Sequence, residues 1–319
     1  MDALKIAART ALDTCMHLKN NETLLIVTDD NKQKIGEALY SIGQEMAKEA
    51  LMITMPPAEV NGQEPPENVA KLMAAYDVVV CPTTKSVTHT DAKRNACARG
   101  TRVATMPGIT EDMMARTLKA DYELIAQRTF KLSELLDKGK VARVTTKLGT
   151  DLTLPIQGIK AISSTGLVRE KGQGGNLPSG ESFLMPEEGK SNGVIYIDAS
   201  VATIGKVSGE PIKVTIEDGF AVKFEGGPEA LILEQALGAF GKDGMNVAEL
   251  GIGTNHEATI TGQILEDEKV MGTIHVAWGN NVSMGGTYNV GVHIDGVVLE
   301  PTVYVDGQKI MEEGRLLLD

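Results

Sequence analysis

The pattern of hydrophobic residues changes near residue 139, and this change constrains the fold more than any other feature. Before it, short apolar runs alternate with longer segments of helical periodicity. The apolar runs are residues 23–28, 51–55, 77–81 and 102–106. The helical segments are residues 2–18, 31–48, 67–75, 90–99 and 110–137. Strands that alternate with helices of this length are typical of βαβ units on a parallel sheet. We therefore predict an N-terminal α/β domain over residues 1–138.

After residue 139, apolar and polar residues alternate one by one between glycine-rich turns. This pattern covers residues 141–146, 151–156, 194–198, 211–216 and 221–225. A period of two is typical of antiparallel strands with one buried face. One helix is expected at residues 227–240, and residues 170–181 read as a glycine-rich loop. We predict a C-terminal domain over residues 139–319 that is mixed, largely antiparallel and rich in β-strands.

Four acidic or imidazole residues stand in Val- and Ile-rich runs near the end of the chain: Glu249, His275, His293 and Asp295. Side chains at i and i+2 point to the same face of a strand. His293 and Asp295 therefore share a face. The expected neighbours on these faces are small or apolar: Val247 and Gly251 beside Glu249, Thr273 and Ala277 beside His275, and Gly291 beside His293. Polar groups with mostly small neighbours leave room for an ion.

Two imidazoles and a carboxylate form the usual ligand set for zinc, iron, cobalt or manganese. The alternative is that His275 and His293 are hydrogen-bonded histidines on half-buried strands. Their spacing matches neither a zinc finger nor the H-E-x-x-H motif. The residues by themselves predict a metal site without fixing its metal or its number of ions.

The chain has 31 basic and 43 acidic residues, which gives a net charge of −12 and a pI near 5.0. This charge disfavours nucleic acid or an anionic membrane surface as a partner. It fits a peptide or small-molecule ligand. The three cysteines form no C-x-x-C pair, and no run of about 18 apolar residues occurs, so we expect a cytoplasmic protein without a membrane span.

Four motifs resemble, in this order, the aminopeptidase T/AmpS metallopeptidase family, whose members are often called leucyl aminopeptidases. They are N-L-P-S-G-E at 176–181, E-L-G-I-G at 249–253, H-V-A-W-G at 275–279 and V-H-I-D at 292–295. The stretches T-H-T-D-A at 88–92 and V-A-T-M-P-G-I-T-E-D-M at 103–113 are similar to the same family. The resemblance covers most of the chain.

The resemblance implies a pair of divalent metal ions in the C-terminal domain, with zinc expected first and cobalt, manganese or iron as other choices. It places the metal ligands at Glu181, Glu249, His275, His293 and Asp295. Without it, Glu181 would be interpreted as a glutamate in a turn. The resemblance also implies two domains and a homodimer.

The activity that the resemblance implies is removal of N-terminal residues by a metal-activated water, with Glu181 or Glu249 moving the proton. The sequence departs from the family at one position. The peptidases carry a tyrosine seven residues after the histidine of the H-x-A-x-G motif, and Val282 stands there in this chain. Tyr288 follows later and would replace that tyrosine only if the loop folds back.

Two other functions remain open at this stage. A ring-opening dioxygenase acting on 2,5-dihydroxypyridine is similar to the same family, and His275, His293 and Asp295 have the composition of a two-histidine, one-carboxylate iron site. The presence of both Glu181 and Glu249 argues against it. The third function is a metal-binding protein without turnover, which Val282 keeps open.

Other polar and aromatic residues of the C-terminal part are expected to have mainly structural roles. Residues 266–269, E-D-E-K, are expected to form a solvated turn between strands, and Trp278 is expected to pack in the core. Asn280, Asn281 and Ser283 follow the His275 strand and are candidates for contacts with a substrate.

Overall fold

A computed structural model describes residues 2–318 of the chain, which divide into two compact units. Unit 1 comprises the chain up to Glu123 together with Gly166–Ser179. Unit 2 comprises Leu124–Thr165 and the chain from Gly180 onward. The chain thus leaves unit 1, returns to it for one short segment, and then stays in unit 2.

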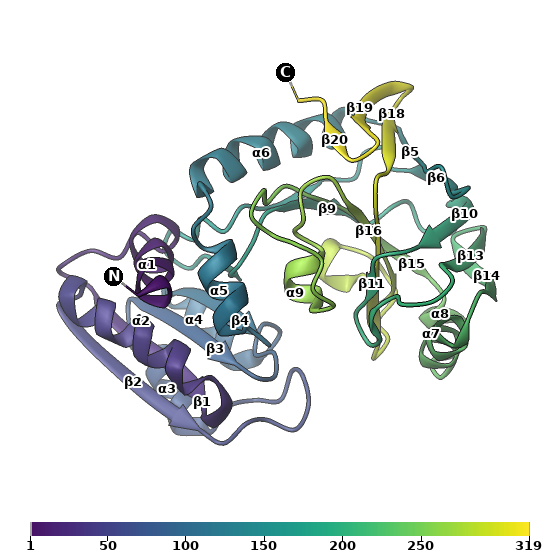
Figure 1. Cartoon of the computed structure of the whole chain (residues 1–319). Coiled ribbons are helices and arrows are strands. Elements are labelled where there is room, and N and C mark those ends of the chain that lie inside the picture. The colour runs from purple at the N-terminus through teal and green to yellow at the C-terminus, as the bar shows by residue number, and fades with distance from the viewer. Residues whose placement is uncertain (1, 319) are drawn as a thin grey trace. The chain divides into compact units, whose positions relative to one another are not determined.

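Unit 1 contains a five-stranded sheet in the order β2-β1-β3-β4-β8 (Figure 1). Its strands are β1 (Thr23–Asp29), β2 (Glu49–Met55), β3 (Val78–Thr83), β4 (Arg102–Pro107) and β8 (Gly174–Asn176). Its helical segments are α1 (Ala3–Arg9), the π-helical turn η1 (Thr10–Cys15), the short turn η2 (Asp30–Lys32), α2 (Gln33–Met46), α3 (Glu67–Met73), α4 (Asp91–Ala98) and α5 (Glu111–Thr117). All paired strands run parallel, which confirms the α/β class predicted for this part of the chain.

Local chemistry explains the helix starts of unit 1. The Thr90 hydroxyl accepts a hydrogen bond from the backbone N–H of Lys93 at the start of α4. Thr110 accepts one from Met113 at the start of α5. A hydroxyl at this position satisfies an N–H that has no partner within the helix. Every residue of β3 is buried, as a central parallel strand requires.

Strand β8 was not predicted, because residues 170–181 read as a loop. Its three residues are Gly174, Gly175 and Asn176, and none carries an apolar side chain. They pair with Val103, Ala104 and Thr105 of β4 through the backbone, and the Asn176 side chain also accepts a hydrogen bond from the Thr105 hydroxyl. A strand held in this way leaves no hydrophobic pattern in the sequence.

Unit 2 contains two sheets in which all strand pairs are antiparallel, as predicted. The eight-stranded sheet has the order β14-β13-β10-β6-β5-β18-β19-β20. Its strands are β5 (Val141–Thr145), β6 (Asp151–Pro155), β10 (Asn192–Ile197), β13 (Ile212–Glu217), β14 (Phe220–Glu225), β18 (Thr302–Val305), β19 (Gln308–Glu312) and β20 (Arg315–Leu316).

The seven-stranded sheet has the order β12-β11-β17-β16-β15-β9-β7. Its strands are β7 (Ile162–Ser164), β9 (Glu181–Leu184), β11 (Ser200–Val201), β12 (Gly205–Lys206), β15 (Val247–Gly253), β16 (Ile274–Gly279) and β17 (His293–Val298). The helical segments of unit 2 are α6 (Tyr122–Lys138), which begins at the boundary, α7 (Pro228–Gly238), α8 (Gly241–Gly244), α9 (Ile264–Asp267) and the short turn η3 (Val282–Met284).

The core of unit 2 lies between its two sheets. The seven-stranded sheet contributes Leu250, Val276 and Trp278, all fully buried, and the eight-stranded sheet contributes residues such as Val144 and Ile195. Trp278 therefore packs in the core as expected. Because one face of the seven-stranded sheet is used for this core, its alternate side chains point to the opposite face.

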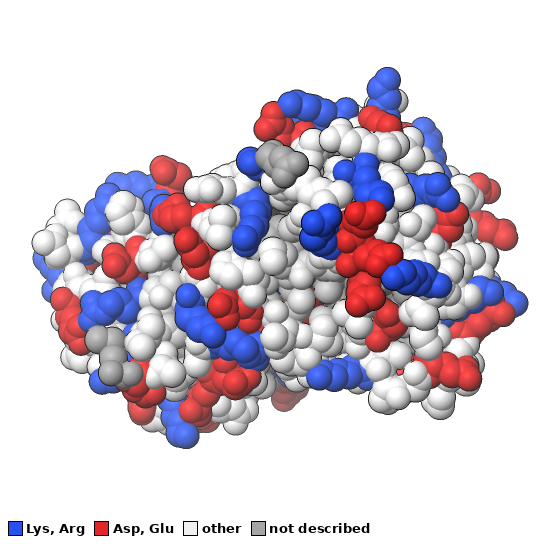
Figure 2. All heavy atoms as spheres, turned by 45° about the horizontal axis from the view of Figure 1, so that its top comes forward, with Lys and Arg blue, Asp and Glu red and all other residues white. Residues whose placement is uncertain are grey.

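No helix within residues 2–318 is long and apolar enough to cross a membrane. On the face that Figure 2 shows, acidic and basic side chains are intermixed, and the basic ones form no continuous patch.

A buried ion pair in unit 1 yields the first prediction. Arg102 donates to both carboxylate oxygens of Glu22, at 3.0 and 2.7 Å, and the Arg102 side chain is only 4% exposed. Removing one partner of a buried pair leaves an uncompensated charge. We expect Arg102→Leu to lower the free energy of unfolding by about 3 kcal/mol in urea titrations. Lys71→Leu, in the exposed pair with Glu67, is the control and should change it by less than about 0.5 kcal/mol.

The same pair predicts a pH dependence. Burial alone would raise the pKa of Glu22, but the hydrogen bonds and charge of Arg102, together with the backbone N–H of Lys19, outweigh burial and hold the pKa below its ordinary value of 4.5. A carboxyl whose pKa is lowered by folding stabilises the protein above the unfolded-state pKa, and this stability is lost as the pH falls through the folded-state value. The wild-type advantage over Arg102→Leu should therefore shrink below about pH 4.5. An unchanged difference at pH 3 would contradict the pair's role.

Candidate metal centre

Four neighbouring strands of the seven-stranded sheet, β9, β15, β16 and β17, carry the predicted site residues on one face. Ala277 of β16 lies opposite Glu249 of β15 on one side and Asp295 of β17 on the other. Residues directly opposite each other in an antiparallel pair share a face. His275 lies opposite Gly251 and His293 lies opposite Gly279. The register thus brings acid and imidazole groups together with glycine and alanine between them.

One predicted neighbour is wrong. Val247 was expected on the Glu249 face, but it packs in the core on the opposite face. The cause is a β-bulge: Val247 pairs with Trp278, and Glu249 pairs with the adjacent residue, Ala277. The extra residue, Ala248, reverses the alternation between them. Because of this bulge, Glu249 points to the polar face.

The five predicted side chains lie together in the structure. His275 Nε2 is 3.2 Å from Glu249 Oε1 and 3.6 Å from Glu181 Oε2. His293 Nε2 is 3.4 Å from Glu249 Oε2 and 3.6 Å from Asp295 Oδ1. Glu249 therefore lies between the two imidazoles. Glu181, Glu249, His275 and Asp295 are at most 8% exposed, while the His293 side chain is 34% exposed.

These separations suit a metal ion. Ligand atoms about 2.1 Å from an ion lie about 3.0 Å apart at a right angle and about 3.4 Å apart at a tetrahedral angle. The contacts between imidazole nitrogen and carboxylate oxygen, at 3.2–3.6 Å, fall close to this range. Glu249, His293 and Asp295 each offer a donor atom within 4.8 Å of the others. The donor set and its spacing therefore fit a divalent metal ion.

His293 is held in the orientation that a metal ligand needs. Its Nδ1–H donates to the backbone carbonyl of Asn280 at 2.7 Å, which leaves Nε2 to face the carboxylates. A hydrogen bond of this kind fixes the tautomer and the ring plane of a ligating histidine. The neighbouring Asn281 is fully buried, and its side chain donates to Glu188 and accepts from the backbone of Tyr288. Asn281 thus organises the loop after β16 instead of facing a substrate.

A glycine provides the space for His275. A side chain at Gly251 would place its Cβ inside contact distance of the His275 ring atoms Nε2 and Cε1. Only a residue without a Cβ allows the imidazole to lie across the β15 backbone. The strand motif E-L-G-I-G thus supplies one acidic group and the room for the adjacent imidazole.

The expectation of a solvated turn at residues 266–269 is wrong. Glu266, Asp267 and Lys269 are at most 1% exposed, and α9 occupies part of this segment. Glu266 accepts the backbone N–H of Thr259, and Asp267 accepts those of Thr261 and Gly262. The charges are buried because each has a backbone or ionic partner. A run of four charged residues carries no sequence signal that separates this arrangement from a surface turn.

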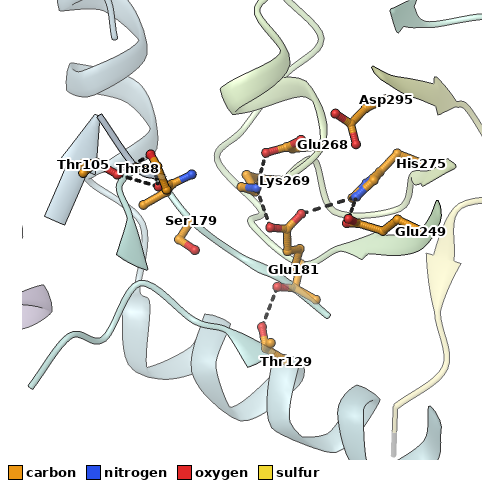
Figure 3. A network of polar contacts seen from close by, with 12 residues as sticks. Thr88, Thr105, Thr129, Ser179, Glu181, Glu249, Glu268, Lys269, His275 and Asp295 are labelled. Atoms are coloured by element: carbon orange, nitrogen blue, oxygen red, sulfur yellow. Dashed lines mark hydrogen bonds and ion pairs between the residues drawn. The ribbon is translucent and has the colours of Figure 1, made fainter. Parts of the chain in front are cut away.

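Lys269 belongs to the candidate site, and sequence analysis missed it. Its ammonium lies 2.5 Å from Glu181 Oε1 and also forms an ion pair with Glu268 (Figure 3). Figure 3 shows Lys269 pointing between these two carboxylates, with His275 on the other side of Glu181. The polar face therefore carries four carboxylates, two imidazoles and one ammonium group.

The charges of these groups depend on one another. Burial would raise the pKa of Glu249, but hydrogen bonds from His275 and His293 lower it to about 2. Burial would lower the pKa of His275, but its hydrogen bond with Glu249 and the charges of Glu181 and Asp295 raise it to about 9. Burial likewise would lower the pKa of Lys269, but Glu181 and Glu268 hold it above its ordinary value. The excess of buried carboxylates stabilises any cation in this region.

Glu268 responds in the opposite direction. Burial, opposed by the Lys269 ammonium and reinforced by the carboxylates of Glu181 and Asp295, raises its pKa to about 7. Glu268 therefore takes up a proton at a higher pH than an ordinary glutamate does.

The position of the peptidase tyrosine does not contribute to the cluster. Val282, which stands there, lies in η3 and is 46% exposed. The Tyr288 ring packs edge-on against Phe220, with ring centroids 5.9 Å apart. Tyr288 is thus occupied by a packing contact.

The comparison with known families identifies the group to which the chain belongs. The model of the family NicX, 2,5-dihydroxypyridine 5,6-dioxygenase, matches residues 4–318. The description of this family is that of a ring-cleaving oxygenase. The chain belongs to the 2,5-dihydroxypyridine 5,6-dioxygenase family. No curated protein sequence matches the chain.

Two solved structures share the fold. The 2,5-dihydroxypyridine dioxygenase from Pseudomonas putida KT2440 has a TM-score of 0.86 and 19% identity, and the match covers 100% of this chain and 99% of that chain. Wild-type AmpT from Thermus thermophilus has a TM-score of 0.73 and 17% identity, with 99% of each chain covered. The resemblance to aminopeptidase T therefore holds at the level of the fold.

The leading prediction, an aminopeptidase, is wrong, and the family match supports the alternative, a ring-opening dioxygenase acting on 2,5-dihydroxypyridine. The family match indicates an oxygenase, so the terms aminopeptidase, metalloprotease and hydrolase do not apply. The four motifs led to this error because they describe the sheet that presents the acid and imidazole groups, and the AmpT structure has the same fold. The motifs do not include Lys269 or Glu268, which change the charge of the site.

The tight contact at Gly251 yields a prediction. We expect Gly251→Ala to displace the His275 ring, to weaken Mn²⁺ binding in equilibrium dialysis, and to destabilise the protein by about 1–3 kcal/mol through overpacking. Gly238→Ala is the control, because its Cβ would make only an ordinary 3.5 Å contact with Met245 at the end of α7. Wild-type Mn²⁺ affinity in Gly251→Ala would show that the imidazole does not need this space.

Proposed function

We propose that this chain opens a dihydroxylated pyridine ring with dioxygen, using a single ferrous ion held by His275, His293 and Asp295. The observation that carries the proposal is the convergence of two imidazole Nε2 atoms and buried carboxylates on one sheet face. Family membership supports the reaction class. Two histidines and one carboxylate are the ligands typical of non-haem iron oxygenases, which keep open positions on the ion.

The arrangement of charges supports one ion instead of the two that were predicted. Glu181 lies 2.5 Å from the Lys269 ammonium, which it shares with Glu268, so this side of the site already holds one cation. Glu249 contacts both imidazoles, whereas His293 and Asp295 lie two residues apart on the same strand. We assign Asp295 as the ligand and Glu249 as the group beside the ion.

The remaining roles follow from the positions of the side chains. Ferrous iron, when bound, would activate both dioxygen and a hydroxylated substrate. Asn280 orients His293 through its carbonyl oxygen. Once both Nε2 atoms are engaged as ligands, the buried Glu249 carboxylate no longer accepts their hydrogen bonds. Its oxygens are then available to take the proton of a substrate hydroxyl.

The balance of the reaction requires no further reactant. The family description denotes insertion of both oxygen atoms across the bond between C5 and C6 of 2,5-dihydroxypyridine. That bond breaks, each of its carbons gains one oxygen atom, and no atom is lost. The proton taken up by Glu249 returns to the opened product. A reductant is therefore not needed.

The direct test is to incubate the anaerobically Fe²⁺-loaded protein with 2,5-dihydroxypyridine and then admit air. We expect loss of the ultraviolet absorption of the ring with uptake of one O₂ per ring opened. A protein loaded with Zn²⁺ is the control and should leave the ring intact. Tight Fe²⁺ binding without oxygen uptake would contradict the proposal and favour a metal-binding protein without turnover.

The two carboxylates beside the histidines should behave differently. We expect Asp295→Asn to weaken Fe²⁺ binding by at least about 100-fold, because a ligand loses its charge. Glu249→Gln should keep the ion but lower kcat by about 10²–10⁴, because a proton acceptor is lost. Metal analysis and oxygen uptake on both variants separate the roles. The reverse pattern would make Glu249 the ligand.

A further inference from the structure

We infer that the Lys269 ammonium occupies the position of a second cation and thereby restricts this centre to one metal ion. The inference rests on the single-ion centre proposed above, and it concerns which residue determines the number of ions. In this role Lys269 neither binds the metal nor contacts the substrate. It sets how many metal ions the site holds.

The position of Lys269 is that of a bound cation. Its side chain is 2% exposed, and its nitrogen lies between the carboxylates of Glu181 and Glu268 (Figure 3). Glu181, Glu268 and His275 each offer a donor atom within 4.8 Å of the others. This second group of donors stands beside the group of Glu249, His293 and Asp295. With His275 assigned to the first ion, Glu181 and Glu268 remain as donors for a second cation, and the ammonium fills that place.

One oxygen of Glu181 points from this place toward the first group. Glu181 Oε2 is buried and makes no hydrogen bond, and it lies 3.6 Å from His275 Nε2. The other oxygen, Oε1, contacts Lys269. Glu181 therefore has one oxygen committed to the ammonium and one unpartnered oxygen aimed at His275. Glu181 therefore already holds one cation, Lys269, and has a second oxygen available to an ion that would replace the ammonium.

Charge decides what happens when Lys269 is removed. A divalent ion cannot enter beside a fixed ammonium without strong like-charge repulsion. Without the ammonium, Glu181 and Glu268 would be buried carboxylates with no cation, which is costly. A divalent ion that binds both then relieves this cost. Lys269→Met preserves the length of the side chain, removes the charge and therefore creates the second ion site.

The experiment counts ions in the full-length apo protein by equilibrium dialysis against Mn²⁺ with elemental analysis. We expect one Mn²⁺ per chain in the wild type and two in Lys269→Met, with the second site at least about 100-fold tighter than in the wild type. Electron paramagnetic resonance should change from the signal of an isolated Mn²⁺ to that of a coupled pair. Lys147→Met, in the exposed pair with Glu313, is the matched control and should bind one ion.

Two further variants make the test independent of how well Lys269→Met folds. Glu181→Gln in the wild-type background should keep one Mn²⁺ with affinity within about threefold, and loss of that ion would overturn the inference by making Glu181 a ligand of the first site. The double variant Lys269→Met with Glu181→Gln should return to one ion. A folded Lys269→Met protein with one ion would also overturn it.

The outcomes separate this inference from the proposed activity. A wild type that binds one Mn²⁺ but opens no ring with Fe²⁺ would refute the activity, and the role of Lys269 would still be decided by the ion counts. A wild type that binds two Mn²⁺ ions would refute the single-ion centre and the role of Lys269 together.

Discussion

The pairing register of β9, β15, β16 and β17 is the constraint on which the site depends. One face of these strands packs in the core through residues such as Leu250, Val276 and Trp278. The opposite face carries all the acid and imidazole groups. A shift by one residue would exchange the two faces, placing charges in the core and the indole in the site. The core thus stabilises the arrangement that the chemistry needs.

The second constraint is the balance of charge on the polar face. Four carboxylates lie close together at low exposure, and such a group is stable only with cations nearby. Lys269 supplies one fixed positive charge, and the raised pKa values of both histidines show that the remaining carboxylates attract another. A bound metal ion would take over the part that these imidazoles play when they are protonated.

Much of this arrangement could be predicted from the alternation of residues. The alternation of residues with a period of two predicts which side chains of β16 and β17 share a face. The apolar runs of unit 1 predict its parallel sheet. Glu181 was found only through resemblance to a family, because it stands at the end of a glycine-containing turn.

What could not be predicted has physical causes that leave no periodic trace. The bulge at Ala248 is one extra residue in an otherwise regular strand, so Val247 was assigned to the wrong face. Strand β8 is held by backbone pairing and by a hydrogen bond from Thr105 to Asn176, not by apolar side chains. The burial of residues 266–269 depends on backbone N–H donors in the preceding loop and, for Lys269, on Glu181, which is far away in the sequence. The leading reaction class was wrong, and the dioxygenase was kept only as an alternative, because related sheets present similar groups while the balancing charge is set by Lys269, a residue outside the motifs.

The two imidazoles of the site differ in their exposure to solvent. His275 is fully shielded, whereas the His293 side chain is 34% exposed. A reagent dissolved in water, such as a chelator, therefore reaches the site more readily at His293 than at His275. Chemical modification of histidine should accordingly label His293 first, and a bound ion that occupies its Nε2 should protect it.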